Sequence, residues 1–154
     1  MAVDNETAGV LVLPPVLFAL PLVLGFLLNR WLPLAVLPAW SGVAGLALLV
    51  FALVPGPWAL VVMIRHDVNP APYMPVRTLV TGGPFRFSRN PIYLTYVLFV
   101  AGIGLYLGNL WILLLLIPAV ITAHYGIIVR EERYLSRRFG ADYEEYKLRV
   151  RRWL

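Results

Sequence analysis

The chain has 154 residues, of which 60% are hydrophobic and 14% are charged, whereas soluble domains average about 25% charged residues. This composition excludes an ordinary soluble domain and predicts an all-α integral membrane protein. The absence of cysteine excludes disulfides, thiolate metal sites and cysteine nucleophiles. The net charge of +5 comes from basic residues beside apolar segments, which favours membrane orientation and contact with anionic lipid over nucleic-acid binding.

The amino-terminal segment carries Asp4 and Glu6, with no Lys or Arg before the first apolar run and no clear cleavage site after it. We therefore expect this run to be a retained span. Four apolar stretches approach the roughly 20 residues that a helix needs to cross a bilayer: 10–28, 41–64, 93–107 and 110–129. The sequence thus predicts a small bundle of about four transmembrane helices.

A tight turn joins the last two apolar stretches. Only Gly108 and Asn109 are clearly loop-like between them, which predicts a tight antiparallel helical hairpin near the C-terminal end of the bundle. The start of the third helix and the end of the fourth must then lie side by side. Proline residues within the first two stretches predict kinks there.

Basic residues indicate the orientation, because short loops rich in Lys and Arg stay in the cytoplasm. Four arginines lie between the second and third stretches and eight basic residues follow the fourth, whereas Arg30 alone lies on the other side. With an even number of spans, we expect both termini and the loop 65–92 at the cytoplasmic face.

We expect one membrane domain, 1–154, with two N-terminal spans in 1–64, a cytoplasmic lid loop at 65–92, the helical hairpin at 93–129 and a cytoplasmic or interfacial tail at 130–154. Several prolines and the Gly82-Gly83 pair disfavour long helices in the loop, which suits an extended lid over the end of the bundle.

Two amphipathic helices are expected in the tail. The first covers 128–139 and stops at Gly140, and Asp142 and Glu145 are spaced like a capping box at the start of the second. On the second helix, apolar residues recur at helical spacing opposite three arginines, which predicts a helix in the headgroup layer. These apolar residues are Tyr143, Tyr146, Val150 and Trp153.

Asn90-Pro91 is a typical helix start, since Asn caps free backbone donors and Pro suits the first helical position. A helix amino terminus flanked by Arg86 and Arg89 could also bind an anion such as a carboxylate. The alternative for both arginines is a purely topological signal.

Glu131 and Glu132 follow the fourth stretch and flank the apolar side of a helix that carries Ile128 and Leu135. They could belong to a solvated ion-pair network with nearby arginines. The hairpin favours a second interpretation, because it brings the two carboxylates next to the start of the third helix. Carboxylates that bind cations and arginines that bind anions then share one pocket.

Gly102 and Gly104 by default mark close packing between helices, and alternatively allow a flat ligand to approach the backbone. His66 and His124 are each expected to be satisfied polar residues, so we predict no metal site. Tyr93 lies one turn into the helix whose start is the candidate binding site.

At these positions the sequence resembles the integral-membrane methyltransferase superfamily that includes isoprenylcysteine carboxyl methyltransferases and phospholipid N-methyltransferases. Its motif is Arg-His/Asn-Pro-x-Tyr, a hydrophobic hairpin and then Glu-Glu, which this chain matches as Arg89-Asn90-Pro91-Ile92-Tyr93 and Glu131-Glu132. The resemblance extends over residues 66–152 and is to bacterial members, which suggests a multi-pass protein of the bacterial inner membrane.

The resemblance implies a methyltransferase that binds S-adenosylmethionine at the cytoplasmic face and takes a lipophilic or small hydrophobic acceptor from the bilayer. The cofactor-binding residues that it implies are Arg89, Asn90, Pro91, Tyr93, Gly102, Gly104, Glu131 and Glu132. Many eukaryotic relatives have His where this chain has Asn90, so a mechanism that needs an imidazole there is in doubt.

The nature of the acceptor stays open at this point. A carboxylate acceptor, as in an isoprenylcysteine, would need an arginine such as Arg86, whereas a phospholipid amine would need proton removal by a carboxylate such as Glu132. Two other classes are an NADPH-dependent membrane reductase of the sterol-reductase type and a non-enzymatic scaffold that binds membrane lipids. The oligomeric state is not indicated.

Overall fold

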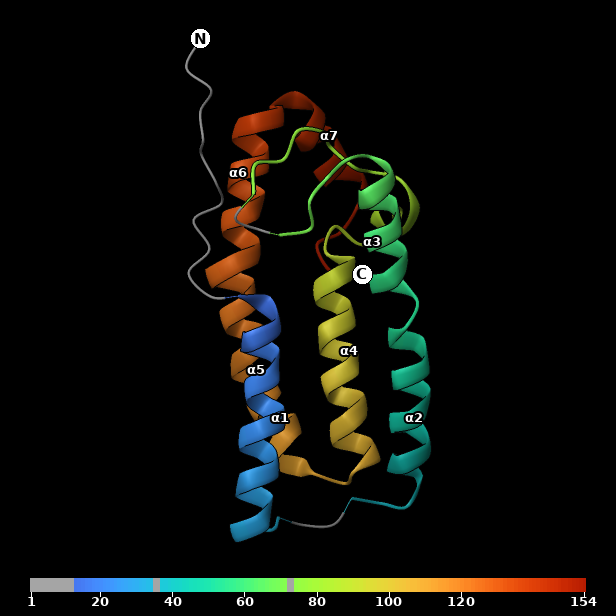
Figure 1. The fold of residues 1–154 in the computed structure, drawn as a ribbon, viewed down its shortest axis with the longest axis vertical. Coiled ribbons are helices and arrows are strands. Elements are labelled where there is room, and N and C mark those ends of the chain that lie inside the picture. The colour runs from blue at the N-terminus through green and yellow to red at the C-terminus, as the bar shows by residue number, and fades with distance from the viewer. Residues whose placement is uncertain (1–12, 35–36, 72–73) are drawn as a thin grey trace.

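The computed structural model describes residues 13–34, 37–71 and 74–154. Asp4, Glu6 and the first three residues of the predicted span 10–28 lie outside this part of the chain. The prediction of an all-α protein is confirmed, since the described residues form helices and no strand (Figure 1). The helices are α1 (Pro14–Trp31), α2 (Trp40–Ala52), α3 (Pro55–Arg65), α4 (Pro91–Tyr106), α5 (Leu110–Ala123), α6 (Val129–Phe139) and α7 (Ala141–Arg149), with a 3₁₀ turn at Gly83–Arg86 and a π-helical turn at His124–Ile128.

Three helical segments of the described chain are long and apolar enough to cross a membrane: Pro14–Trp31, Trp40–Arg65 and Leu110–Phe139. The second joins α2 and α3 through a turn before Pro55, where proline cannot continue the hydrogen-bond ladder. The predicted third span corresponds to α4, which has 16 residues, or about 24 Å of helix against a hydrocarbon core of about 30 Å. A count of four crossing helices therefore stays a prediction.

Helix α4 is the centre of the bundle and packs against α1, α2, α3 and α5 (Figure 1). Glycine allows the closest of these contacts, since a Cβ on Gly45 of α2 would lie 2.7 Å from the carbonyl oxygen of Gly102 on α4. Between α1 and α4, the rings of Phe18 and Tyr96 stack with centroids 5.3 Å apart. The core is thus held by direct helix-to-helix packing.

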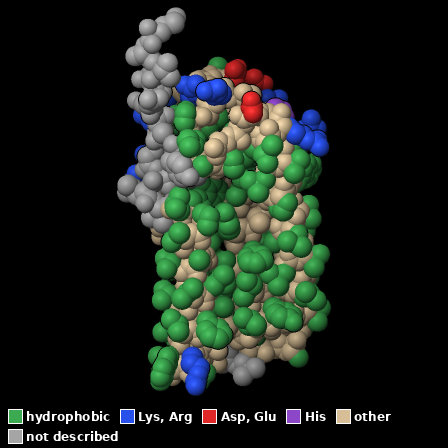
Figure 2. Space-filling model, in the orientation of Figure 1, with side chains coloured by type: hydrophobic (Ala, Val, Ile, Leu, Met, Phe, Trp, Pro, Cys, Tyr) green, Lys and Arg blue, Asp and Glu red, His purple; other side chains and the backbone are tan. Residues whose placement is uncertain are grey.

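The outer surface of the bundle is apolar. Figure 2 shows hydrophobic side chains over the length of the face, whereas acidic side chains and most of the basic ones gather at one end. Large side chains such as Phe26 and Val43 are exposed on this surface. An apolar belt with charged groups at its ends is the pattern of a protein that sits in a bilayer.

The predicted hairpin is present between α4 and α5. Asn109 is buried, accepts a hydrogen bond from the amide of Ile112 at the start of α5, and donates from Nδ2 to the carbonyl of Gly25 on α1. Gly108 has a φ of +62°, which an L-residue rarely adopts. The same turn therefore closes the hairpin and fixes it against α1.

The loop after α3 crosses the end of the bundle that carries the charged residues (Figure 1). Both backbone polar groups of Val76 are hydrogen-bonded to side chains of α6. Its amide donates to the hydroxyl of Tyr134 at 3.1 Å, and its carbonyl accepts from Nε of Arg138 at 2.6 Å. The loop is therefore held over the bundle by side chains of α6.

Helix α6 ends at Phe139, and Gly140 after it has a φ of +52°. The predicted capping box of α7 is wrong, because Gly140 occupies the cap position and no side chain caps the helix. The second tail helix is shorter than its apolar spacing suggested: α7 ends at Arg149, so Val150 and Trp153 lie beyond it, and Tyr143 and Tyr146 are buried within the protein. The apolar spacing on α7 thus serves internal packing. A place for α7 in the headgroup layer stays a prediction.

Candidate active site

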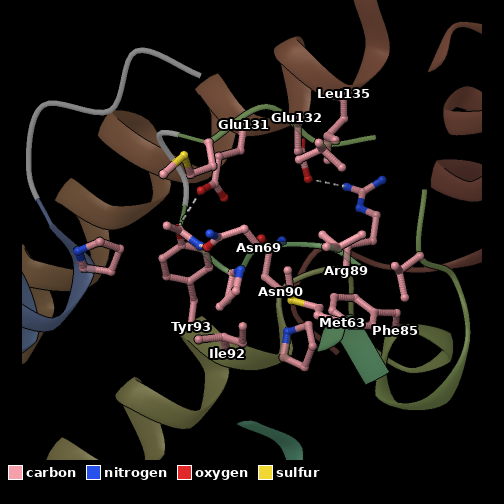
Figure 3. Close-up of a pocket in the computed structure, with 18 of the residues that line it drawn as sticks. Met63, Asn69, Phe85, Arg89, Asn90, Ile92, Tyr93, Glu131, Glu132 and Leu135 are labelled. Carbon is pink, nitrogen blue, oxygen red and sulfur yellow. Dashed lines mark hydrogen bonds and ion pairs between the residues drawn. The ribbon is translucent and has the colours of Figure 1, made fainter. Parts of the chain in front are cut away.

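A cavity of about 420 Å³ lies between the crossing loop and the charged end of the bundle, a volume within the range of about 300–1,000 Å³ that is typical of small-molecule sites. Figure 3 shows its polar side chains pointing inward from α4 and α6. Residues of α1, α3, the crossing loop and α7 complete the wall. The lining includes Pro14, Leu60, Met63, Arg89, Asn90, Tyr93, Glu131, Glu132, Tyr143 and Tyr146.

Glu131 and Tyr93 join the two halves of the motif. The Tyr93 hydroxyl donates a 2.8 Å hydrogen bond to Oε1 of Glu131 (Figure 3). Glu131 makes no ion pair with any residue of the described chain. This carboxylate therefore stands at the cavity with a neutral partner, and is suited to a cationic or hydroxyl-bearing ligand.

Glu132 lies between two arginines. Its Oε1 is 3.0 Å from Nη2 of Arg89 (Figure 3), and Arg152 donates to both of its oxygens, at 3.0 Å from Nε and 2.6 Å from Nη2. The side chains of Glu132 and Arg89 are only 9% and 10% exposed. A bidentate pair of this kind is strong and directional, and its hydrogen bonds raise the pKa of Arg152. Both carboxylate oxygens of Glu132 are thus paired with arginine side chains.

Asn90 occupies the N-cap position of α4, but its side chain does not cap the helix. Nδ2 of Asn90 donates instead to the carbonyl oxygen of Arg152 at 3.0 Å. The prediction that the Asn90 side chain caps α4 is therefore wrong, although the helix starts at Pro91 as expected. Both residues line the cavity.

Two tyrosines of α7 form part of the wall. Burial raises the pKa of Tyr143, and the nearby Glu132 carboxylate raises it further. Burial likewise raises the pKa of Tyr146, whose hydroxyl donates to the carbonyl of Phe85 at 2.6 Å. Both phenols are neutral at physiological pH, so this wall adds polar contacts without charge.

Three of the sequence-predicted site residues do not reach the cavity. Arg86 is exposed at the end of the 3₁₀ turn and is not among the lining residues. Gly102 and Gly104 lie deeper in α4, where a Cβ would meet Leu49 at 2.9 Å and Leu113 at 2.7 Å, respectively. The two glycines thus serve helix packing, which was the default interpretation.

Sequence reasoning missed Arg152. Its position among other basic residues of the tail indicated only membrane topology. In the structure Arg152 contacts Glu132 and also His124, and Nε2 of His124 is 2.9 Å from Nη1 of Arg152. His124 is a satisfied polar residue, as predicted. No group of three potential ligands for a metal ion occurs among the residues that the structure describes.

The phospholipid methyltransferase family matches residues 40–142, which is more than half of the chain and contains the Arg89–Tyr93 and Glu131-Glu132 motifs. An uncharacterized protein of Haemophilus influenzae is 40% identical over 63 residues, which is 41% of this chain and 100% of that relative. No solved structure matches the chain. The cavity, its motif residues and the family match lead to one conclusion: the chain belongs to the phospholipid methyltransferase family, whose members are membrane methyltransferases.

Proposed function

We propose that the protein is a methyltransferase that uses S-adenosylmethionine to methylate an amine on a lipophilic acceptor. The observation that carries the choice of an amine is Glu131, the carboxylate at the cavity that has Tyr93 as its hydrogen-bond partner and no ion pair in the described chain. A carboxylate acceptor would need a guanidinium of its own, but Arg86 is outside the cavity, and the unpartnered Nε of Arg89 would be used by the carboxylate of the cofactor.

The donor set fits the proposed cofactor. Nε of Arg89 is buried and has no hydrogen-bond partner among the described residues, so it can donate to a carboxylate. Carboxylate oxygens of Glu131 can accept from an ammonium or ribose hydroxyl, and the aromatic ring of Tyr93 can face a sulfonium. These groups come from both halves of the motif and line one cavity.

An apolar wall suits the acceptor. Pro14 at the start of α1 and Leu60 and Met63 on α3 are apolar residues of the cavity wall. A hydrocarbon chain placed there would lie along helices whose outer surfaces face the bilayer. The amine at its head would then reach Glu131.

S-adenosylmethionine, when bound, supplies an activated methyl group. Glu131 takes a proton from the acceptor ammonium, which frees the nitrogen lone pair. With its lone pair free, the nitrogen would accept the methyl group, and the sulfur of the cofactor would keep the electron pair of the carbon–sulfur bond. Orientation by the cavity walls and exclusion of water by the crossing loop supply most of the rate acceleration.

We further propose that the protein is a multi-pass protein of the bacterial inner membrane with the cavity at the cytoplasmic face. The support is the distribution of basic residues: Arg30 stands at one end of the bundle, whereas the others lie at the end of α3, in the crossing loop, on α6 and α7, and in the segment after α7.

Calorimetry with S-adenosylhomocysteine on the detergent-purified protein tests the cofactor. We expect saturable binding by the wild type and by Arg77→Ala, whose side chain is exposed outside the cavity, and weaker binding by Glu131→Gln. Saturable binding of NADPH in its place would overturn the proposal in favour of a reductase.

Transfer of a labelled methyl group tests the acceptor. Phosphatidylethanolamine and a prenylated cysteine are offered separately in mixed micelles. We expect label only on the amine, and a large loss of kcat in Glu131→Gln. Label on the prenylcysteine carboxylate alone would show that the choice of an amine is wrong.

A further inference from the structure

The segment after α7 runs back across the start of α4. Val150 has extended backbone angles, with φ −124° and ψ 130°. The amide of Arg89 donates to the carbonyl oxygen of Arg151 at 3.0 Å, and Nδ2 of Asn90 donates to that of Arg152 at 3.0 Å. Two consecutive carbonyls of the segment therefore hold two consecutive residues of the motif.

Ser88 strengthens this attachment. It is 2% exposed, and its hydroxyl donates to the carbonyl of Arg152 at 3.3 Å and accepts from the amide of Asn90 at 3.1 Å. Buried polar groups of this kind are costly to leave without partners. The conformation of the chain just before α4 thus depends on the residues 150–153.

The side chain of Arg152 contacts Glu132, the residue that pairs with Arg89. It takes both oxygens of Glu132, and its remaining Nη1 lies 2.9 Å from Nε2 of His124. Arg152 is outside the main cavity, so it reaches Glu132 from the far side. Glu132 is therefore fixed from behind while its Oε1 faces Arg89.

Arg89 is left with one contact to this carboxylate. Its Nη2 pairs with Oε1 of Glu132 at 3.0 Å and its Nη1 donates to the carbonyl of Lys147 at 3.4 Å, while Nε is buried without a partner in the described chain. One carboxylate then serves two guanidinium groups, and Arg89 keeps a donor, Nε, that no described residue uses. An anionic group of the ligand would supply the missing partner.

We propose that Arg152 is a positioning residue, which acts through Glu132 to hold the Arg89 guanidinium ready for the cofactor's carboxylate, while the carbonyls of Arg151 and Arg152 hold the backbone before α4. This inference rests on the proposed function, because the carboxylate belongs to the proposed cofactor. It gives the Arg152 side chain and two backbone carbonyls a part in shaping the binding site, although the cavity wall does not include them.

The test compares Arg152→Ala and Arg152→Lys with Arg151→Ala. Arg151 is a matched control, because its exposed side chain makes no hydrogen bond, ion pair or ring contact with the described residues. Its carbonyl bond to Arg89 does not depend on the side chain. The affinity for S-adenosylhomocysteine is measured by calorimetry and the melting temperature by scanning fluorimetry. Arg89→Ala and the double variant with Arg152→Ala complete a mutant cycle.

We expect Arg152→Ala to weaken binding of S-adenosylhomocysteine about tenfold or more, because it loses a charge-assisted bidentate contact. Arg152→Lys should bind with intermediate affinity. The affinity of Arg151→Ala should stay within about twofold of the wild type. The effects of Arg89→Ala and Arg152→Ala should not multiply, because both act through one guanidinium. A purely structural role of Arg152 predicts multiplicative effects that follow the melting temperature, and this result would overturn the proposal. The Arg152→Lys variant keeps the test decisive where Arg152→Ala fails to fold.

Hydrogen exchange at the Arg89 amide separates this inference from the proposed function. If the wild type binds no S-adenosylhomocysteine, the proposed function and the cofactor part of the inference both fail. If the wild type binds and Arg152→Ala binds equally well, only the inference fails. Slow exchange of the Arg89 amide in the wild type supports the hold by the Arg151 carbonyl, and exchange as fast as that of a free amide contradicts it.

Discussion

Tyr93 and Glu131 are 38 residues apart in the chain and are joined by a 2.8 Å hydrogen bond. Tyr93 is in the first turn of α4, and Glu131 is in the first turn of α6. They meet because the α4–α5 hairpin is tight and because the π-helical turn His124–Ile128 carries the helical path from α5 into α6 without a break. The contact is therefore a direct product of the topology.

Tyr93→Phe should weaken binding of S-adenosylhomocysteine about tenfold or more. The substitution keeps the ring but leaves the Glu131 carboxylate without its donor, and a hydrogen bond to a charged group contributes roughly 1.5–3 kcal/mol. Calorimetry on the detergent-purified variant measures the change. Tyr106→Phe is the control, since Tyr106 is exposed at the far end of the same helix, and equal affinities of the two variants would contradict the role of the hydroxyl.

Much of the site followed from the sequence because its determinants are local. Gly108 and Asn109 were the only loop-like residues between two apolar stretches, which was enough to place the two halves of the motif together. Helix α4 starts at Pro91 because proline has no amide to satisfy there. Such features depend on neighbouring residues and can be read without a structure.

The contacts that sequence reasoning missed join distant residues. The local pattern around Asn90 favours a side-chain cap, yet its Nδ2 bonds a carbonyl 62 residues later. Arg152 has the same local appearance as the exposed Arg151 beside it, and only the fold distinguishes them. Gly102 matched a motif position, and whether it contacts a ligand or a helix depends on the placement of α2.

Glu132→Gln should destabilise the folded protein by at least about 2–3 kcal/mol. This value is near the lower end of the cost of breaking a buried ion pair, since Arg152 is partly exposed. The amide would leave two guanidinium groups without a counter-charge. Urea unfolding in detergent, followed by tryptophan fluorescence, measures the change.

Glu145→Gln is the control for this variant. The Glu145 pair with Arg149 spans 3.6 Å and both side chains are more than 60% exposed, so its loss should cost less than about 0.5 kcal/mol. Similar losses of stability in the two variants would show that the network around Glu132 contributes no more than a surface pair.

Gly45→Ala should destabilise the bundle, whereas Gly42→Ala on the same helix should not. A Cβ at position 45 would lie 2.7 Å from the Gly102 carbonyl and 2.8 Å from Cα of Tyr106, and backbone atoms cannot move aside without separating α2 from α4. A Cβ at position 42 meets nothing within 4 Å, and alanine favours the helix by about 1 kcal/mol over glycine. Melting temperatures in detergent should therefore fall for the first variant and stay level or rise for the second.

Labelling of single cysteines tests the orientation, because the native chain contains none. Leu148→Cys places a thiol on α7, at a side chain that is 89% exposed, and Leu34→Cys places one beyond α1 at the opposite end of the bundle. With the basic end in the cytoplasm, a membrane-impermeant maleimide should label Leu34→Cys in intact spheroplasts and Leu148→Cys only after the membrane is opened. The reverse pattern would place the cavity on the outer side, where S-adenosylmethionine is not made, and would leave the proposed reaction without its methyl donor. Labelling of both positions in intact spheroplasts would mean that the chain between them crosses the membrane an even number of times. This result would rule out three crossings between these positions, by α2 with α3, by α4 and by α5.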